Sequence, residues 1–143
     1  EVKTAYGGLR DWHNTYTWYS GSKGYTRGGS CQGGINCDTQ SYVNFINGNE
    51  RLCGYADWRL PTRQELVSIM IYVIYGQGPR IDLTYFPNTP TPAAYALRHL
   101  QYFWSSSFGP VALSAWYVDF DDGYTKFSNF SNPYPVRLVR AGP

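Results

Sequence analysis

Long apolar runs, a strong net charge and metal-binding clusters are all missing from this sequence of 143 residues. No apolar stretch reaches the roughly 18 residues that a membrane-spanning helix needs, so we expect no membrane span. Lys and Arg number 12 against 10 Asp and Glu, and no run of Lys or Arg occurs. The resulting net charge of +2 is too small to predict a nucleic-acid partner. The histidines, His13 and His99, lie far from the cysteines, and no CxxC pattern exists, so we expect neither a metal nor another cofactor.

Cysteine is also scarce, and its number is odd: Cys31, Cys37 and Cys53. Because charges are few and tyrosines many, a disulfide in an oxidising compartment is a better prediction than a zinc site. A bond between Cys37 and Cys53 would close a loop of about 16 residues and contribute about 3 kcal/mol by the chain-entropy estimate. Cys31 would then be a free thiol or pair with a segment outside this chain. We therefore expect an extracellular or cell-surface protein whose signal peptide has already been removed.

Aromatic residues, by contrast, are abundant. They make up 18% of the chain, and 14 of them are tyrosines. Rigid, amphipathic tyrosine side chains are favoured on binding surfaces because they lose little entropy when they are fixed. Strands also favour aromatic residues, whatever the function of the domain. Composition alone leaves both interpretations open.

The first of two predicted helices spans residues 38–47. Asp38 is a good N-cap residue, and Gly48 is expected to end the helix. Tyr42, Phe45 and Ile46 would lie on its buried face.

The second predicted helix spans residues 63–75 and has a complete start signal. Thr62 can cap the first free amides, and Glu65 can reach back to the Thr62 amide. Arg59 is expected to pair with Asp57 or Glu65. The helix is apolar on nearly all sides, which favours a contact with a second copy of the chain. We assign that oligomer contact to Ile71, Tyr72, Ile74 and Tyr75.

Short strands are predicted after a proline-rich connection over residues 76–101. A hairpin turn is expected at Asp121, Asp122 and Gly123 because Asp-Gly favours such turns. Two helices followed by an antiparallel meander indicate an α+β fold, which we expect to form one domain over residues 1–143. The predicted strands cover residues 101–106, 115–120, 124–130 and 135–140.

Six motifs in order along the chain resemble a known family. They are Cys-Asp-Thr at 37–39, Leu-Cys-Gly-Tyr-Ala-Asp-Trp-Arg-Leu-Pro-Thr at 52–62, Tyr-Phe-Pro-Asn at 85–88, Phe-Trp-Ser-Ser-Ser at 103–107, Ala-Trp-Tyr-Val-Asp-Phe at 115–120 and Val-Arg-Leu-Val-Arg at 136–140. Together they resemble the bacterial domain family typified by the C-terminal domain of the Legionella collagen-like adhesin. The resemblance implies a C-type-lectin-like fold, with two helices packed on a short antiparallel sheet and long irregular loops. It also implies a piece of a longer exported protein, because family members carry a Thr-Gly-Leu-X-Trp segment before the equivalent of residues 1–4.

The Arg-Leu-Pro-Thr helix start at 59–62 is also similar to that of the related formylglycine-generating enzymes. Those enzymes depend on a cysteine pair late in the domain, whereas every cysteine here precedes the second helix. The similarity therefore supports the fold, and an oxidase-like enzyme is the weakest alternative. We expect no catalytic residues, because Ser105, Ser106 and Ser107 share no recognisable spacing with the histidines.

The polar and aromatic positions of the last hairpin, with Arg137 on a free strand face, form the predicted recognition surface. Aromatic rings stack on sugar faces while polar groups fix the orientation of the ligand. The predicted ligand-binding residues are Tyr117, Asp119, Tyr124, Lys126, Asn129, Tyr134 and Arg137. The resemblance implies an adhesion module with a glycan, a sulfated polysaccharide or another host or surface polymer as partner. An ordinary exposed sheet face is an equally good interpretation, and a structural subunit of a surface fibre or homo-oligomer is the alternative function.

Overall fold

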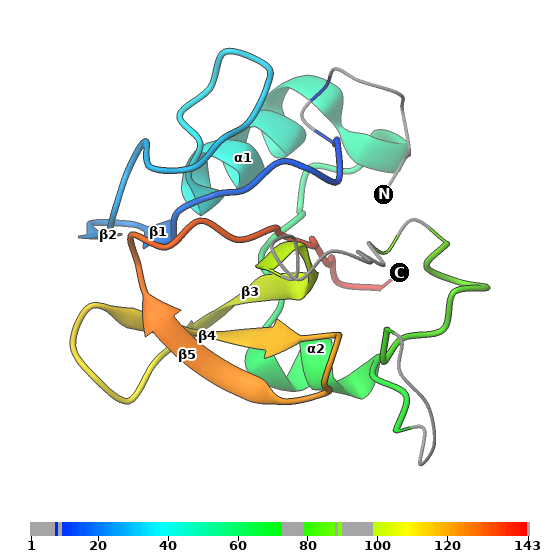
Figure 1. Ribbon diagram of the computed structural model, residues 1–143. Helices are drawn as coiled ribbons and strands as arrows, with labels where there is room; N and C mark the ends of the chain where they lie inside the picture. The colour runs from blue at the N-terminus through cyan, green and yellow to red at the C-terminus, as the bar shows by residue number, and fades with distance from the viewer. Residues whose placement is uncertain (1–7, 9, 73–78, 88, 90–98, 143) are drawn as a thin grey trace.

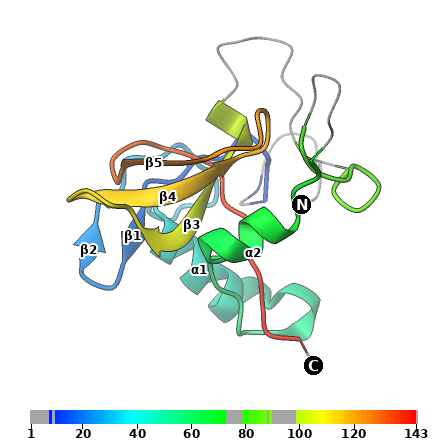
Figure 2. The same cartoon turned by 90° about the horizontal axis from the view of Figure 1, so that it is seen from below.

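The computed structural model describes residues 8, 10–72, 79–87, 89 and 99–142. They form short helices and two small antiparallel sheets, which confirms the predicted α+β class (Figures 1 and 2). The strands are β1 (Tyr19–Ser20), β2 (Lys23–Gly24), β3 (Tyr102–Phe108), β4 (Ser114–Asp119) and β5 (Thr125–Asn129). The helical segments are α1 (Thr39–Phe45), the π-helix η1 (Ile46–Glu50), the 3-10 helix η2 (Leu52–Gly54) and α2 (Arg63–Ser68). The β1–β2 hairpin and α1 lie in one half of the molecule, and the β3–β5 sheet and α2 lie in the other (Figure 1).

The larger sheet has the strand order β3-β4-β5, with antiparallel neighbours. The register of the last hairpin places Trp116 opposite Phe127 and Tyr117 opposite Lys126. Its turn includes Gly123, whose φ of 83° lies in the left-handed region that glycine tolerates. The first three predicted strands are therefore confirmed, with bounds that shift by at most two residues.

The predicted fourth strand, over residues 135–140, does not close the sheet. This end of the chain makes only isolated bridges, to Tyr16 and to Arg59. Pro133 and Pro135 have no backbone N–H group, so they cannot donate to a continuous ladder. The segment runs between the two halves of the molecule and is bonded to both of them (Figure 1).

Helix α1 begins where the sequence predicts, with Asp38 as its N-cap residue. The prediction that Gly48 ends the helix is wrong, because α1 continues into η1 and the chain leaves the helix only at Arg51, which has a φ of 43°. Asn47 stabilises this extension through two hydrogen bonds with the backbone of Trp58, at 2.7 and 2.9 Å.

Helix α2 begins with the predicted capping box. The Thr62 hydroxyl accepts from the Glu65 amide at 3.2 Å, and the Glu65 carboxylate accepts from the Thr62 amide at 2.7 Å. The predicted end at residue 75 is wrong, because α2 stops at Ser68. Beyond the helix, Met70 forms a bridge with Ile81, and the Ile71 amide donates to the Arg80 carbonyl at 2.9 Å. Tertiary pairing thus ends the helix early.

The two faces of the larger sheet bury different clusters. Helix α2 covers one face, where Leu66 packs with Phe103 and Val118. On the other face, Trp18 and Trp104 are fully buried. Both tryptophans join the halves of the molecule through an indole N–H: Trp18 donates to the Ser105 carbonyl and Trp104 to the Tyr16 carbonyl, each at 2.8 Å.

Acid is expected to weaken the fold through Glu65. Arg59 donates to its carboxylate at 2.6 and 2.8 Å, so the predicted Arg59–Glu65 pair is present. Hydrogen bonds from Arg59 and from the Thr62 amide lower the pKa of Glu65 from 4.5 to about 2. A lowered pKa means that the pair stabilises the fold fully above about pH 4.5 and loses this contribution as the pH falls towards 2. Because both side chains are partly exposed, solvent screening keeps the effect small.

We therefore expect the melting temperature of the Glu65→Gln variant to change less than that of the wild type between about pH 5 and pH 2. Circular dichroism would measure both proteins. If the melting temperatures of both proteins fell equally in acid, carboxylates other than Glu65 would account for the acid sensitivity of the fold.

Candidate functional site

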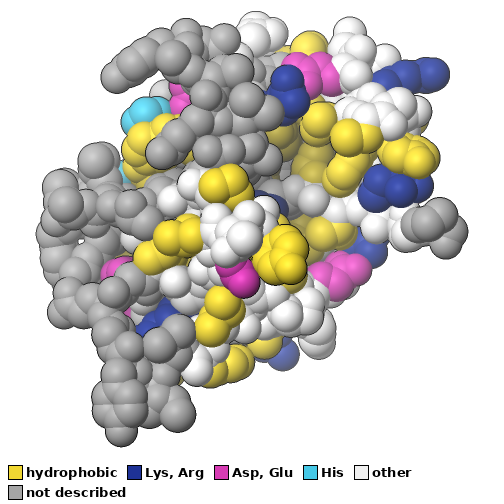
Figure 3. All heavy atoms as spheres, turned by 90° about the vertical axis from the view of Figure 1, so that its right-hand side faces the viewer, with side chains coloured by type: hydrophobic (Ala, Val, Ile, Leu, Met, Phe, Trp, Pro, Cys, Tyr) yellow, Lys and Arg dark blue, Asp and Glu magenta, His cyan; other side chains and the backbone are white. Residues whose placement is uncertain are grey.

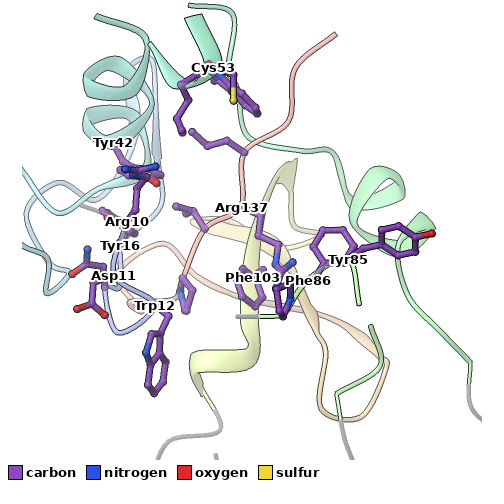
Figure 4. Close-up of a pocket in the computed structure, with 17 residues that line it drawn as sticks. Arg10, Asp11, Trp12, Tyr16, Tyr42, Cys53, Tyr85, Phe86, Phe103 and Arg137 are labelled. Carbon is purple, nitrogen blue, oxygen red and sulfur yellow. The ribbon is translucent and has the colours of Figure 1, made fainter. Parts of the chain in front are cut away.

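A cavity of about 370 Å³ opens between the two halves of the molecule. Its lining is rich in rings, which belong to Trp12, Tyr16, Tyr42, Trp58, Tyr85, Phe86 and Phe103. Figure 4 shows aromatic side chains from both halves on opposite sides of the cavity, with Arg137 between them. A concave, mostly apolar site with a few polar groups is the usual form of a ligand pocket.

Tyr16 and Tyr42 form one side of the cavity, with ring centroids 4.8 Å apart. The bridge to Tyr134 holds Tyr16, and helix α1 carries Tyr42. Burial raises the pKa of the Tyr16 hydroxyl well above its ordinary value.

Trp12 also lines this side and is held by its neighbours in the sequence. Its ring lies on His13, with the centroids 3.5 Å apart. The buried Asp11 carboxylate accepts from the His13 amide at 2.9 Å and lies 2.9 Å from His13 Nδ1. A hydrogen-bonded turn therefore presents Trp12, although no helix or strand does so.

Arg137 lies between the two sides of the cavity, and its guanidinium is packed among rings. Its guanidinium lies 4.4 Å from the ring centroid of Phe103, 5.0 Å from that of Phe86 and 5.3 Å from that of Phe120. Its Nη2 donates to the Thr89 hydroxyl at 2.6 Å. Only 9% of the residue is exposed, so the prediction of a free strand face was wrong. The alternation of strand faces does not apply here, because the end of the chain forms no regular strand.

Charged groups around the cavity are few and mostly paired. Arg10 lines the cavity, and its Nε lies 3.3 Å from a carboxylate oxygen of Glu50. Asn14, also in the lining, donates to the Gly8 carbonyl at 2.8 Å. On the face of the molecule that Figure 3 presents, charges of both signs are likewise interspersed with apolar side chains. Recognition in this cavity would depend on rings and individual polar groups more than on an electrostatic field of one sign.

Four of the predicted site residues do come together, on the sheet face away from α2. The rings of Tyr117 and Tyr134 have centroids 4.9 Å apart, and Lys126 Nζ lies 2.9 Å from the Asp119 carboxylate. Tyr102, which sequence reasoning missed, has its ring centroid 5.1 Å from that of Tyr117. Tyr117 is only 7% exposed and Asp119 only 2%, so these two groups support the sheet more than they offer a surface. Burial raises the pKa of Tyr117 to about 12, and it raises the pKa of Asp119 despite the neighbouring lysine.

Tyr124 and Asn129 lie apart from this group. Tyr124 is exposed on the hairpin turn, where its amide donates to the Asp122 carboxylate. The Asn129 side chain accepts from the amide and the hydroxyl of Ser131, and so holds the turn after β5.

Sequence reasoning also missed the cavity residues of the N-terminal segment, such as Trp12 and Tyr16. This segment has no period of 2 or 3.6 residues, so no face could be assigned to it. The density of Trp and Tyr over residues 11–19 was the one available signal.

The predicted disulfide between Cys37 and Cys53 is wrong: Cys37 is bonded to Cys31, with a Cα–Cα distance of 5.5 Å. Gly33 and Gly34, with φ of 107° and 71°, turn the short loop back so that its ends meet. Cys53 is a free, exposed thiol beyond η1 and also lines the cavity.

Of the predicted oligomer contacts, Ile71 and Tyr72 are exposed, at 39% and 72%. Ile74 and Tyr75 lie outside the described residues.

Two kinds of feature are absent from the described residues. Across those ranges, no three His, Cys, Asp or Glu side chains are grouped as a metal ion would require. None of the helices described here has the length and apolar character needed to cross a bilayer.

The family model described as Lcl C-terminal domain matches residues 5–140. No curated protein and no solved structure matches the chain significantly.

Proposed function

The chain belongs to the Lcl C-terminal domain family, and we propose that it is an extracellular, non-catalytic domain that binds a glycan in the aromatic cavity. Membership indicates an adhesin-related module, and the Cys31–Cys37 disulfide is consistent with an extracellular location. A single C-type-lectin-like domain is part of the proposal, supported by small antiparallel sheets, short helices and long loops. All three cysteines precede α2, which argues against the late cysteine pair of an oxidase.

The ring-lined cavity is the observation that carries this proposal. Trp12 and Tyr85 offer ring faces that can stack on a sugar, and Tyr85 is 79% exposed. The half-buried Arg10, which pairs with Glu50, adds a cation. A sulfated or otherwise anionic polysaccharide would use both the rings and the cation.

The Tyr85→Ala variant is expected to bind glycans about tenfold more weakly than the wild type, because it removes one stacking ring. A glycan array that includes sulfated polysaccharides would find the ligand, and calorimetry would measure the affinity. Tyr85 is largely solvent-exposed, so the fold should not change.

Tyr124→Ala is the matched control, because Tyr124 is also a largely exposed tyrosine but lies on the last hairpin. We expect wild-type affinity from it. Weaker binding by Tyr124→Ala with normal binding by Tyr85→Ala would place the ligand on the hairpin surface instead, and the absence of any glycan ligand would refute the proposal.

A structural role in a homo-oligomer or surface fibre is the second candidate function. The exposed apolar side chains of Ile71 and Tyr72 favour it. Light scattering at high concentration tests it, and a strict monomer would count against it.

A further inference from the structure

The connection between β3 and β4 exposes apolar side chains at a protruding point of the molecule. Phe108, Val111 and Leu113 are 53%, 54% and 66% exposed. In Figure 1 the connection extends away from the body at the lower left, and in Figure 2 it again lies at the margin of the molecule. We call Phe108, Val111 and Leu113 the apolar tip.

The connection is ordered by its own hydrogen bonds. The Gly109 amide donates to the Ser114 carbonyl at 2.8 Å, and the Ser114 hydroxyl donates to the Val111 carbonyl at 2.7 Å. A Cβ at Gly109 would lie 2.1 Å from the Ser114 hydroxyl, so only glycine fits there. Leu113 has a φ of 58°, in the left-handed region that leucine rarely adopts. A strained backbone that presents an exposed leucine suggests a functional use for that side chain.

One cation lies against the apolar tip, and a second follows it closely in the sequence. Lys23 Nζ lies 5.4 Å from the ring centroid of Phe108. Arg27 follows in the same glycine-rich segment, and both cations are exposed. Residues 19–36 and 103–118 contain no Asp or Glu. Within the described part of the chain, neither cation forms a salt bridge.

We propose that the apolar tip docks on an anionic lipid bilayer, with Val111 and Leu113 in the interfacial region and Lys23 on the phosphate headgroups. Apolar side chains beside cations are the combination that peripheral membrane proteins use at anionic surfaces. A protruding, convex tip can enter a deformable bilayer without a complementary groove. This contact is separate from the cavity, so it extends the proposed function and does not depend on it.

Co-sedimentation with vesicles tests the proposal. The wild type should bind phosphatidylcholine vesicles that contain about 30% phosphatidylglycerol, and should bind pure phosphatidylcholine vesicles at least fivefold more weakly. The Val111→Ser/Leu113→Asn variant should bind the anionic vesicles at least about tenfold more weakly than the wild type. Asparagine tolerates the left-handed backbone conformation of residue 113, so the substitution at this position should not lower the melting temperature. Lys23→Gln should lower binding about fivefold, and only on anionic vesicles.

Leu83→Asn is the control, because Leu83 is 43% exposed and belongs to the segment of residues 79–87, which lies on the opposite side of Figure 1. It should bind vesicles like the wild type. Failure of the wild type to bind anionic vesicles would overturn the proposal, as would wild-type binding by the double variant. A smaller species in light scattering for the double variant alone would also overturn it, because the apolar tip would then be a contact between copies of the chain.

Discussion

Replacing Trp104 with alanine is expected to lower the free energy of unfolding by about 4 kcal/mol. The indole is fully buried, and its ring centroid lies 4.8 Å from that of Tyr134. Its N–H donates to the Tyr16 carbonyl in the other half of the molecule. The substitution therefore creates a large cavity and also removes a partner from a buried carbonyl. Chemical denaturation followed by circular dichroism would measure the change.

Two further variants separate these effects. Trp104→Phe keeps most of the packing but loses the hydrogen bond to Tyr16, so it should cost about 2 kcal/mol. Trp116→Ala removes a half-buried ring from the same sheet and should cost less than Trp104→Ala. A loss below about 2 kcal/mol for Trp104→Ala would contradict the view that this indole joins the two halves.

The parts of the fold that the sequence predicts correctly are those with local causes. The Asp38 cap, the capping box at Thr62 and the turn at Gly123 each depend on residues at most four positions apart. Their hydrogen bonds join residues that are close in the sequence, so the local pattern is enough to predict them. The alternation of β4 likewise depends only on neighbouring residues, so this strand was found.

The parts that failed depend on segments distant in the sequence. Helix α2 ends early because the residues beyond it pair with the Arg80 segment, which the apolar pattern cannot reveal. Cys37 meets Cys31 because of the backbone path through two glycines, and three cysteines allow several pairings. The cavity combines rings from five separate stretches of the chain, so no single motif predicts it.

Arg137 illustrates the same limit, because its contacts come from segments that are distant in the sequence. Arg137→Ala is expected to lower the free energy of unfolding by about 3 kcal/mol, because the cation packs on Phe86, Phe103 and Phe120 and bonds to Thr89. Replacing an arginine that binds a ligand on an exposed surface would lower the free energy of unfolding far less. Thermal denaturation of the alanine variant measures this difference directly.

Arg137→Lys separates a structural role from a role in binding. Lysine keeps the charge but cannot stack a planar guanidinium on the rings, so stability should fall partway towards that of the alanine variant. Because Arg137 is buried among these rings, glycan affinity measured on the folded fraction should remain within about twofold of the wild type. If the lysine variant instead kept its stability and lost glycan binding, the guanidinium would be a ligand contact. The role predicted from the sequence would then hold, at a site inside the cavity and not on the exposed sheet.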